Sequence, residues 1–339
     1  MPKLVSSKLY RQLEFQAVGS WWIYAPPNAA SSSFAEPTVG LSEQEQGTLK
    51  RVPNGREDVF ADKSIDLKAK RSLMKFLRFV GDFERQLGVW EEWAEKPFPD
   101  FLRAQFDLPW ELHIPVLALT LSPRSPSKTL TSFALPRIKR HLSSIGVFGL
   151  GFAAVAPKWG GGAEIAQVAS RACAVGGGVY VLGRAVESIS PANDLSSNHV
   201  DSHLRISLQG EETVDATWVV GSHDDLPKSQ SAYNSDSATR SITVVSSPLA
   251  PLFPVTAEGA PSPGGAVVVF PTGSLSHEVK IGDEVPPVYI VVHSSETGEC
   301  PDGQCKQPKL IFSCSNLMMT QHYEYLSTLS AITLKMPYL

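Results

Sequence analysis

The 339-residue sequence has few cysteines and no long hydrophobic run. Its four cysteines are irregularly spaced and lack the paired Cys-x-x-Cys hooks of structural zinc sites, so we predict reduced thiols and no metal site. No apolar run approaches the ~20 residues that a membrane helix needs, and the residues that follow Met1 form no apolar signal core. These absences predict a cytosolic protein.

The sequence also lacks the common catalytic motifs and a strong charge of one sign. We find no Gly-x-Ser-x-Gly elbow, no His-Glu-x-x-His motif and no Gly-x-x-x-x-Gly-Lys-Ser/Thr loop, and the eight histidines are scattered. A net charge of −4 gives no reason to expect nucleic acid or an anionic membrane as a partner. We therefore predict no catalytic residue and no nucleic-acid partner.

What the chain does have is a glycine-rich segment at residues 157–182. Three glycines at 160–162 precede a helical pattern, three more at 176–178 end it, and the apolar residues 179–182 are typical of a strand. This order predicts a short helix that is held between two glycine turns and a strand.

That predicted helix has one polar edge. Glu164, Gln167 and Arg171 stand at i, i+3 and i+7, so they fall within about 60° of one another. Geometry alone favours a solvated edge with a modest Gln–Arg contact. A neighbouring apolar stripe is expected to face the core; it comprises Ile165, Val168, Ala172 and Val175.

The rest of the chain divides into helical and extended parts. Residues 64–145 have apolar side chains three and four apart and predict several helices, whereas residues 9–24 are rich in strand formers. Short strands are expected at residues 179–182, 204–208, 216–220, 241–245, 266–270 and 288–292. Residues 28–48, 221–239 and 247–263 contain much serine and proline and are predicted to be flexible loops.

The glycine-rich segment resembles the Rab escort protein and Rab GDP-dissociation inhibitor family. The similarity lies in Gly-x-Gly-(x)-Glu-x-x-Gln-x-x-x-Arg followed by Gly-Gly-x-Tyr-x-Leu, with Ala163 as a one-residue insertion. Residues 4–15 and 70–77 resemble two other family segments, and residues 97–102 resemble a helix of the escort branch. The escort branch is therefore favoured over plain inhibitors.

The resemblance implies an α+β fold with a large domain of the FAD/NAD(P)-binding type. The large domain I would comprise residues 1–63 and 146–339, and residues 64–145 would form an inserted all-α domain II. Relatives open with a βαβ unit that is missing here, and both ends of the chain look truncated. Residues 149–154 imitate the dinucleotide fingerprint, but a helix precedes them and Arg171 stands where the acidic residue is needed. We therefore expect no flavin or nicotinamide cofactor.

The function that the resemblance implies is chaperoning. An escort protein binds a GDP-bound Rab GTPase, presents it to the two-subunit Rab geranylgeranyltransferase, and keeps the prenylated Rab soluble. Such a carrier is needed because each buried CH₂ of a prenyl chain contributes about 0.8 kcal/mol. The implied location is the cytoplasm, with transient membrane association during Rab delivery, and the implied lipid carrier is domain II.

The resemblance also assigns candidate site residues. The Rab-binding platform would use Glu164, Gln167, Arg171, Val179 and Val181. The Rab C-terminal tail would meet Trp21 or Trp22, since adjacent strand residues point to opposite faces and only one can be core on a single-sided sheet. The prenyltransferase would contact Phe98, Phe101 and Leu102, with Phe98 as an exposed anchor.

Two other interpretations remain open from the sequence. The same fold carries flavin oxidases, so the chain could be a truncated flavin-dependent oxidoreductase, although the missing βαβ unit argues against activity. It could also be a non-functional fragment or a faulty gene model.

Overall fold

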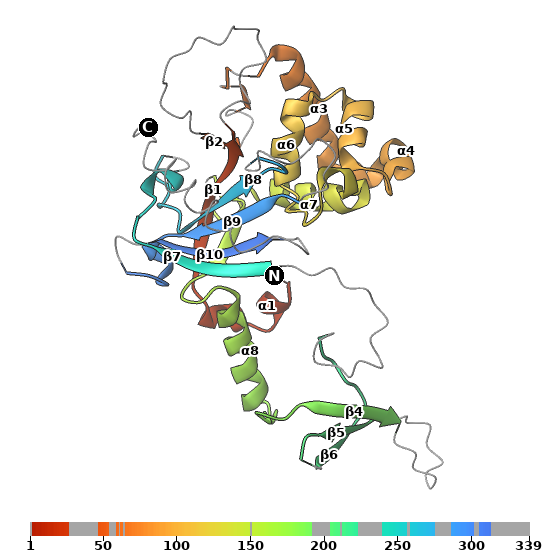
Figure 1. Ribbon diagram of the computed structural model, residues 1–339, viewed down its shortest axis with the longest axis vertical. Coiled ribbons are helices and arrows are strands. Elements are labelled where there is room, and N and C mark those ends of the chain that lie inside the picture. Colours follow the sequence, from red (N-terminus) through yellow and green to blue (C-terminus); the bar gives the residue numbers. More distant parts are fainter. Residues whose placement is uncertain are drawn as a thin grey trace, which may run out of the picture. The chain divides into compact units, whose positions relative to one another are not determined.

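The computed structural model describes most of the chain in two compact units (Figure 1). One unit comprises residues 1–168 and 237–339, and the other comprises residues 169–236. The described residues are 2–26, 47–53, 59–60, 62–63, 65–149, 151–191, 204–210, 212–222, 239–255, 258–274, 286–301 and 305–312.

The larger unit is built on a seven-stranded sheet of order β2-β1-β8-β9-β10-β7, with β3 also paired to β1. Strand β1 runs parallel to β8, and the other pairs in this sheet are antiparallel. The strands are β1 (Phe15–Ala25), β2 (Thr48–Arg51), β3 (Ala154–Pro157), β7 (Thr239–Val245), β8 (Gly265–Phe270), β9 (Val288–His293) and β10 (Cys305–Phe312). The strands predicted at 241–245, 266–270 and 288–292 are thereby confirmed.

Both faces of this sheet are covered, because the run Gly-Ala-Val-Val-Val-Phe of β8 is buried along its whole length. On one face Trp22 packs against Leu249 and Leu252, which flank and form the 3₁₀ turn Ala250–Leu252, and its Nε1 donates a hydrogen bond to the Leu252 carbonyl at 3.2 Å. On the other face Trp21 packs in a cluster that includes Ala118.

The prediction that one of the two tryptophans is exposed is therefore wrong. Trp21 is 5% exposed and Trp22 is 3% exposed. The reason is that the prediction assumed a single-sided sheet, whereas helices cover one face and the segment around Leu252 covers the other. The predicted loop at 247–263 contributes this cover, while most of the loops predicted at 28–48 and 221–239 lie outside the described residues.

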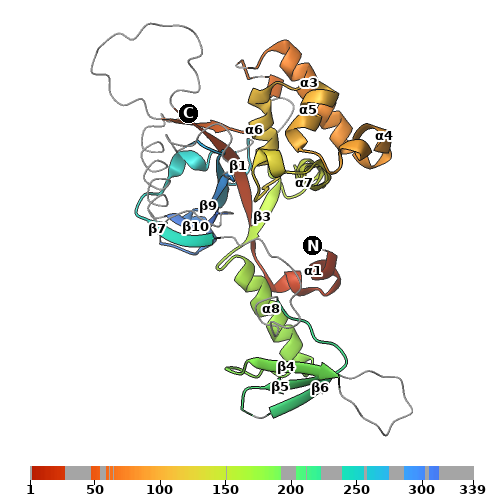
Figure 2. The same ribbon diagram turned by 45° about the vertical axis from the view of Figure 1, so that its right-hand side comes forward.

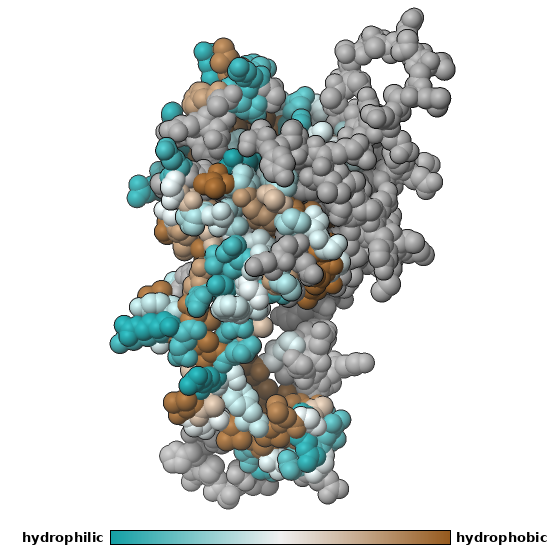
Figure 3. All heavy atoms as spheres, turned by 90° about the vertical axis from the view of Figure 1, so that its left-hand side faces the viewer, coloured by the Kyte–Doolittle hydropathy of each residue, from teal (hydrophilic) through white to brown (hydrophobic). Residues whose placement is uncertain are grey.

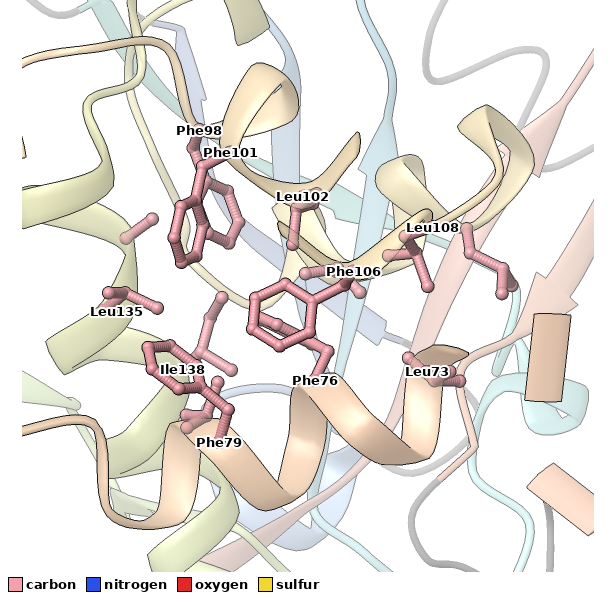
Figure 4. Packing of buried hydrophobic residues seen from close by; sticks show 14 of the residues in the cluster. Leu73, Phe76, Phe79, Phe98, Phe101, Leu102, Phe106, Leu108, Leu135 and Ile138 are labelled. Atoms are coloured by element: carbon pink, nitrogen blue, oxygen red, sulfur yellow. The ribbon is translucent and has the colours of Figure 1, made fainter. Parts of the chain in front are cut away.

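The helices predicted within residues 64–145 form a cluster with an aromatic core (Figure 4). Asp66 caps the first of them by accepting a hydrogen bond from the Ala69 amide at 2.6 Å. Pro136 lies inside the last of them. The helices are α3 (Leu67–Gly81), α4 (Leu87–Trp90), α5 (Phe98–Phe106), α6 (Trp110–Ala118) and α7 (Thr131–Ser144), joined by 3₁₀ turns at Phe83–Arg85, Glu91–Trp93 and Pro126–Lys128.

Phe98 lies inside this core, so the prediction that it is an exposed anchor is wrong. Phe98, Phe101 and Leu102 each have 0% exposure. The Phe98 amide donates to the Thr129 carbonyl at 2.8 Å, and a β-bridge joins Pro97 to Leu130. These bonds fix the start of α5 against the segment before α7 and turn the Phe98 ring toward Phe76 and Phe101 (Figure 4).

The predicted domain boundaries differ from the compact units. The predicted division separates residues 64–145 from the sheet, whereas the structure keeps these helices in one unit with it. Contacts explain this: Ile114 and Ala118 of α6 pack directly on Val267, Val269 and other residues of the sheet. Figure 2 shows β3, which follows the helices, beside β1.

The smaller unit contains a three-stranded antiparallel sheet, β4 (Val186–Pro191), β5 (Leu204–Leu208) and β6 (Glu212–Ala216). Arg205 pairs with Asp215 across β5 and β6 through bonds of 2.8 and 3.0 Å. The strand predicted at 204–208 is confirmed. The strand predicted at 216–220 is wrong, because the pairing partner of β5 is the preceding stretch and ends at Ala216. In the larger unit, short helical segments also lie at Pro2–Ser6 (α1), Leu9–Gln12 and Ser295–Thr297.

Candidate functional site

The turn that leads from β3 into helix α8 (Gly162–Val175) is anchored on two sides. On one side the Lys158 amide donates to the Glu14 carbonyl at 2.9 Å, and Lys158 Nζ lies 3.6 Å from the Glu14 carboxylate. On the other side the Trp159 amide donates to the Thr297 carbonyl at 2.8 Å. The start of α8 is therefore held by backbone bonds to segments far away in the sequence.

Helix α8 carries the predicted polar edge, with Glu164 in its first turn. Gln167 Nε2 donates to Glu164 Oε1 at 3.4 Å, and a carboxylate at this end of a helix is favoured by the macrodipole. Glu164 is half-buried, whereas Gln167 and Arg171 are exposed. Within the described part of the chain, Arg171 forms no ion pair or side-chain hydrogen bond. The boundary between the compact units falls inside α8, after Val168.

The apolar stripe of α8 does not face a core, contrary to the prediction. No residue of α8 is buried, Ile165 is 38% exposed and Val175 is 83% exposed. Figure 3 shows exposed hydrophobic residues between hydrophilic ones on one face of the molecule. A contiguous exposed apolar patch is typical of a surface that binds a partner, whereas single exposed apolar side chains are ordinary.

The segment after α8 is tied to the helix and is not a strand. Gly176, Gly177 and Gly178 donate their amides to carbonyls of the last helical turn, and Gly177 has a φ of 92°. Tyr180 Oη donates to the Ser170 carbonyl at 3.0 Å. The strand predicted at 179–182 is wrong, because these bonds turn the chain back along α8 and away from a pairing partner.

This geometry leaves the two valines of the predicted platform at the surface. Val179 is 85% exposed and Val181 is 53% exposed. The structure therefore places Glu164, Gln167 and Arg171 along one helix and Val179 and Val181 just beyond its end. It does not bring Trp21, Trp22, Phe98, Phe101 or Leu102 to the surface.

Comparison with known proteins identifies the family. The family model described as GDP dissociation inhibitor matches residues 3–251. The chain belongs to this family. The resemblance that residues 157–182 predicted is thus confirmed.

Curated relatives of this family member carry the name Rab proteins geranylgeranyltransferase component A. The protein from Saccharomyces cerevisiae is 30% identical over 305 residues, which cover 88% of this chain and 43% of that protein. Component A 2 from Mus musculus is 33% identical over 144 residues, 42% of this chain and 22% of that protein. The chain spans less than half the length of these relatives.

A solved structure of the family has a similar fold. The crystal structure of Rab GDI from Plasmodium falciparum matches with a TM-score of 0.60 at 16% identity, over 96% of this chain and 66% of that one. The GDI-like mixed α/β fold is therefore confirmed in its coarse outline.

Among the described residues of this GDI-family chain, one histidine has a strongly lowered pKa. His141 of α7 meets the ring of Trp21 edge to face at a centroid distance of 5.0 Å, and burial lowers its pKa to about 4. Burial also raises the pKa of Tyr289, whose Oη donates to the Ser122 carbonyl at 2.9 Å. These groups lie where helices meet the sheet, so they belong to packing.

The described residues contain neither a cluster of metal ligands nor a helix that could span a membrane. Among these residues no group of three His, Cys, Asp or Glu side chains is placed to hold a metal ion. In the same part of the chain no helix is both long enough and apolar enough to cross a membrane.

Sequence reasoning missed the contact that Trp159 makes with residues 297–298. Trp159 belongs to the family-like segment, yet its spacing gives no signal of a role. The contact joins residues about 140 positions apart, and only the sheet brings them together, because β3 and the segment after β9 both lie near the start of β1.

Proposed function

We propose that this chain acts as a Rab escort protein. It binds GDP-bound Rab GTPases, presents them to the α/β heterodimer of Rab geranylgeranyltransferase, and keeps the prenylated Rab soluble until delivery to a membrane. The observation that carries the proposal is the family match over residues 3–251, together with relatives named as component A of that transferase. As an accessory component in the cytoplasm it has no catalytic role and associates with membranes only during delivery.

We assign Rab binding to the exposed edge of α8 and the segment beyond it. Arginine is enriched in the energetic centre of protein interfaces. Arg171 offers five N–H donors without a partner among the described residues, and Val179 and Val181 offer apolar area. The anchoring of α8 at its start supports this role, because a fixed edge loses less conformational entropy on binding.

The helices within residues 64–145 are the candidate region for the lipid and the transferase. Phe98, Phe101 and Leu102 are not proposed as the contact, because they are buried in the core of that region. Trp21 and Trp22 are likewise not proposed as the site for the Rab C-terminal tail.

The test is a binding titration of the purified chain with a GDP-loaded, unprenylated Rab GTPase. We expect Arg171→Ala to weaken binding by about 1–3 kcal/mol, roughly 5- to 150-fold in Kd, because a charged hydrogen bond at a buried interface is lost. Arg140→Ala is the matched control, since Arg140 is an exposed arginine on α7. The same Rab loaded with a GTP analogue should bind more weakly.

Two results would contradict the proposal. If the chain folds but does not bind the GDP-loaded Rab, the escort function is wrong for this chain. If it binds and Arg171→Ala has the affinity of Arg140→Ala, the polar edge of α8 is an ordinary solvated helix surface.

A further inference from the structure

Trp159 has a backbone conformation that bulky residues rarely adopt. Its φ is 75°, in the left-handed region, which carries an energetic cost for a residue other than glycine. Its amide bond to the Thr297 carbonyl and the position of Lys158 Nζ, 4.6 Å from the ring centroid, offset that cost. The surrounding structure thus holds Trp159 in place, although its side chain is 55% exposed.

The segment that contacts Trp159, residues 293–299, is held by several hydrogen bonds of its own. Ser294 donates its amide and its hydroxyl to the Gly264 carbonyl at 2.9 and 3.2 Å, and Thr297 Oγ1 donates to the Ser294 carbonyl at 2.9 Å. His293 pairs with Glu299, with side chains only 9% and 4% exposed. These bonds close the turn between the end of β9 and Glu299. We call this turn, residues 294–299, the seat of Trp159.

Gly298 is the point of this seat that touches the tryptophan. It has a φ of 73°, and a Cβ atom added there would overlap Cε3 and Cζ3 of Trp159. Only glycine therefore allows the indole ring to lie where it does. The ring and Gly298 form a complementary pair across residues that are distant in the sequence.

A short series of contacts links Trp159 to the polar edge of α8. Gly160 follows Trp159, and a Cβ atom at Gly160 would come within 2.9 Å of Glu164 Oε1, so this carboxylate lies directly against the turn. Glu164 Oε1 in turn accepts the hydrogen bond from Gln167 at 3.4 Å. All these residues belong to the larger compact unit.

We infer that Trp159, seated on Gly298, is a positioning residue that sets the first turns of α8 and thereby aims Glu164 and Gln167 at the GTPase. This inference rests on the proposed function for its Rab-binding consequence. The positioning itself is a property of the free chain and can be measured without a partner.

The test variant is Gly298→Ala, whose new methyl group displaces the indole ring. We expect amide hydrogen exchange in residues 161–168 to rise at least tenfold, and the Kd for the GDP-loaded Rab to rise at least tenfold. Gly259→Ala is the matched control: Gly259 has a φ of 75°, so backbone strain is the same, but no atom lies within 4 Å of the added Cβ. It should change neither quantity by more than about threefold.

Variants at Trp159 separate ring displacement from general damage to the turn. Trp159→Ala should reproduce the exchange and affinity losses of Gly298→Ala, whereas Trp159→Tyr, which keeps an aromatic ring on Gly298, should stay within about threefold of the unchanged chain. The double variant should lose no more than Trp159→Ala alone, because no ring remains for the methyl group to displace.

The outcomes distinguish this inference from the escort function. Unchanged exchange in Gly298→Ala, or fully additive losses in the double variant, would overturn the positioning role whatever the Rab result. Raised exchange with unchanged Rab affinity would show that Trp159 positions α8 but that Glu164 and Gln167 do not contact the GTPase. A chain that shows raised exchange and binds no Rab in any form would overturn the proposed function and the aiming of α8 at the GTPase, and leave the positioning of α8 standing.

Discussion

The helical cluster at residues 65–149 and helix α8 use apolar side chains in opposite ways. In the cluster, Phe76, Phe98 and Leu135 are each 0% exposed. Along and after α8, Val175 and Val179 are more than four-fifths exposed. Both regions have helical periodicity in the sequence, so periodicity by itself does not distinguish them.

The difference lies in what each stripe meets. The stripe of α3 is buried because α5 and α7 pack against it, and aromatic rings of α3 and α5 contact one another. The stripe of α8 meets no buried cluster in the described part of the chain. An amphipathic pattern therefore predicts that a helix has an apolar face, and the surroundings decide whether that face is core or surface.

The largest effect is expected when a buried ring of the cluster is removed. Phe98→Ala should lower the free energy of unfolding by about 3–5 kcal/mol, because it removes a fully buried ring and leaves a cavity. Urea denaturation measures the loss, and Phe98→Leu, which keeps most of the volume, should cost clearly less. A loss below about 1 kcal/mol for Phe98→Ala would mean that the ring is not part of the core.

The contact between the cluster and the sheet predicts a dependence on pH. Burial lowers the pKa of His141 to about 4 in the folded state, against 6.5 as the ordinary value. As pH falls from about 6.5 to 4, the unfolded chain binds a proton there and the folded chain does not, so the free energy of unfolding falls. From pH 7 to pH 5 the contribution is about 2 kcal/mol.

The measurement compares urea denaturation of the unchanged chain and of His141→Gln at both pH values. The unchanged chain should lose about 2 kcal/mol more than the variant between pH 7 and pH 5. Equal losses would show that His141 titrates normally and is open to solvent.

The smallest effect on stability is expected at the exposed valines. Val179→Ser and Val181→Ser should each change the free energy of unfolding by less than about 0.5 kcal/mol, because neither side chain is buried. Under the proposed function, the double variant should weaken binding of the GDP-loaded Rab several-fold. A marked loss of stability would instead indicate that this segment packs against another part of the protein.

Local sequence signals predicted several elements well. Helix α5 lies in the region predicted to be helical, because Pro99 suits a first helical turn and aromatic residues recur three and four apart. Strand β8 was recognisable as a continuous apolar run between glycine and proline. The polar edge of α8 was also predictable, since glycine clusters mark both of its ends.

The failures at Trp21 and Phe98 depend on long-range packing. Nothing local to Trp21 shows that α6 covers its face of the sheet, and nothing near Phe98 shows that Thr129 binds its amide. Residues 179–182 have strand-forming side chains, yet the bond from Tyr180 to the Ser170 carbonyl, which the pattern does not reveal, keeps them beside the helix. Contacts between distant segments are decided by the fold and not by spacing.

Strand β1 pairs with the strands on both sides of the helical cluster, which bears on how the length of the cluster can change. Strand β2, where the chain leaves the sheet, pairs Arg51 with Trp22, and strand β3, where it returns, pairs Ala154 with Val18 of the same strand. The excursion through residues 52–153 therefore starts and ends within a few residues of one another on β1. Closing a longer loop between fixed ends costs only about 0.6 kcal/mol for each doubling of its length. Insertions or deletions in residues 52–153 can therefore add or remove helices of the cluster. The sheet that carries the Trp159 turn and α8 keeps its strand pairing.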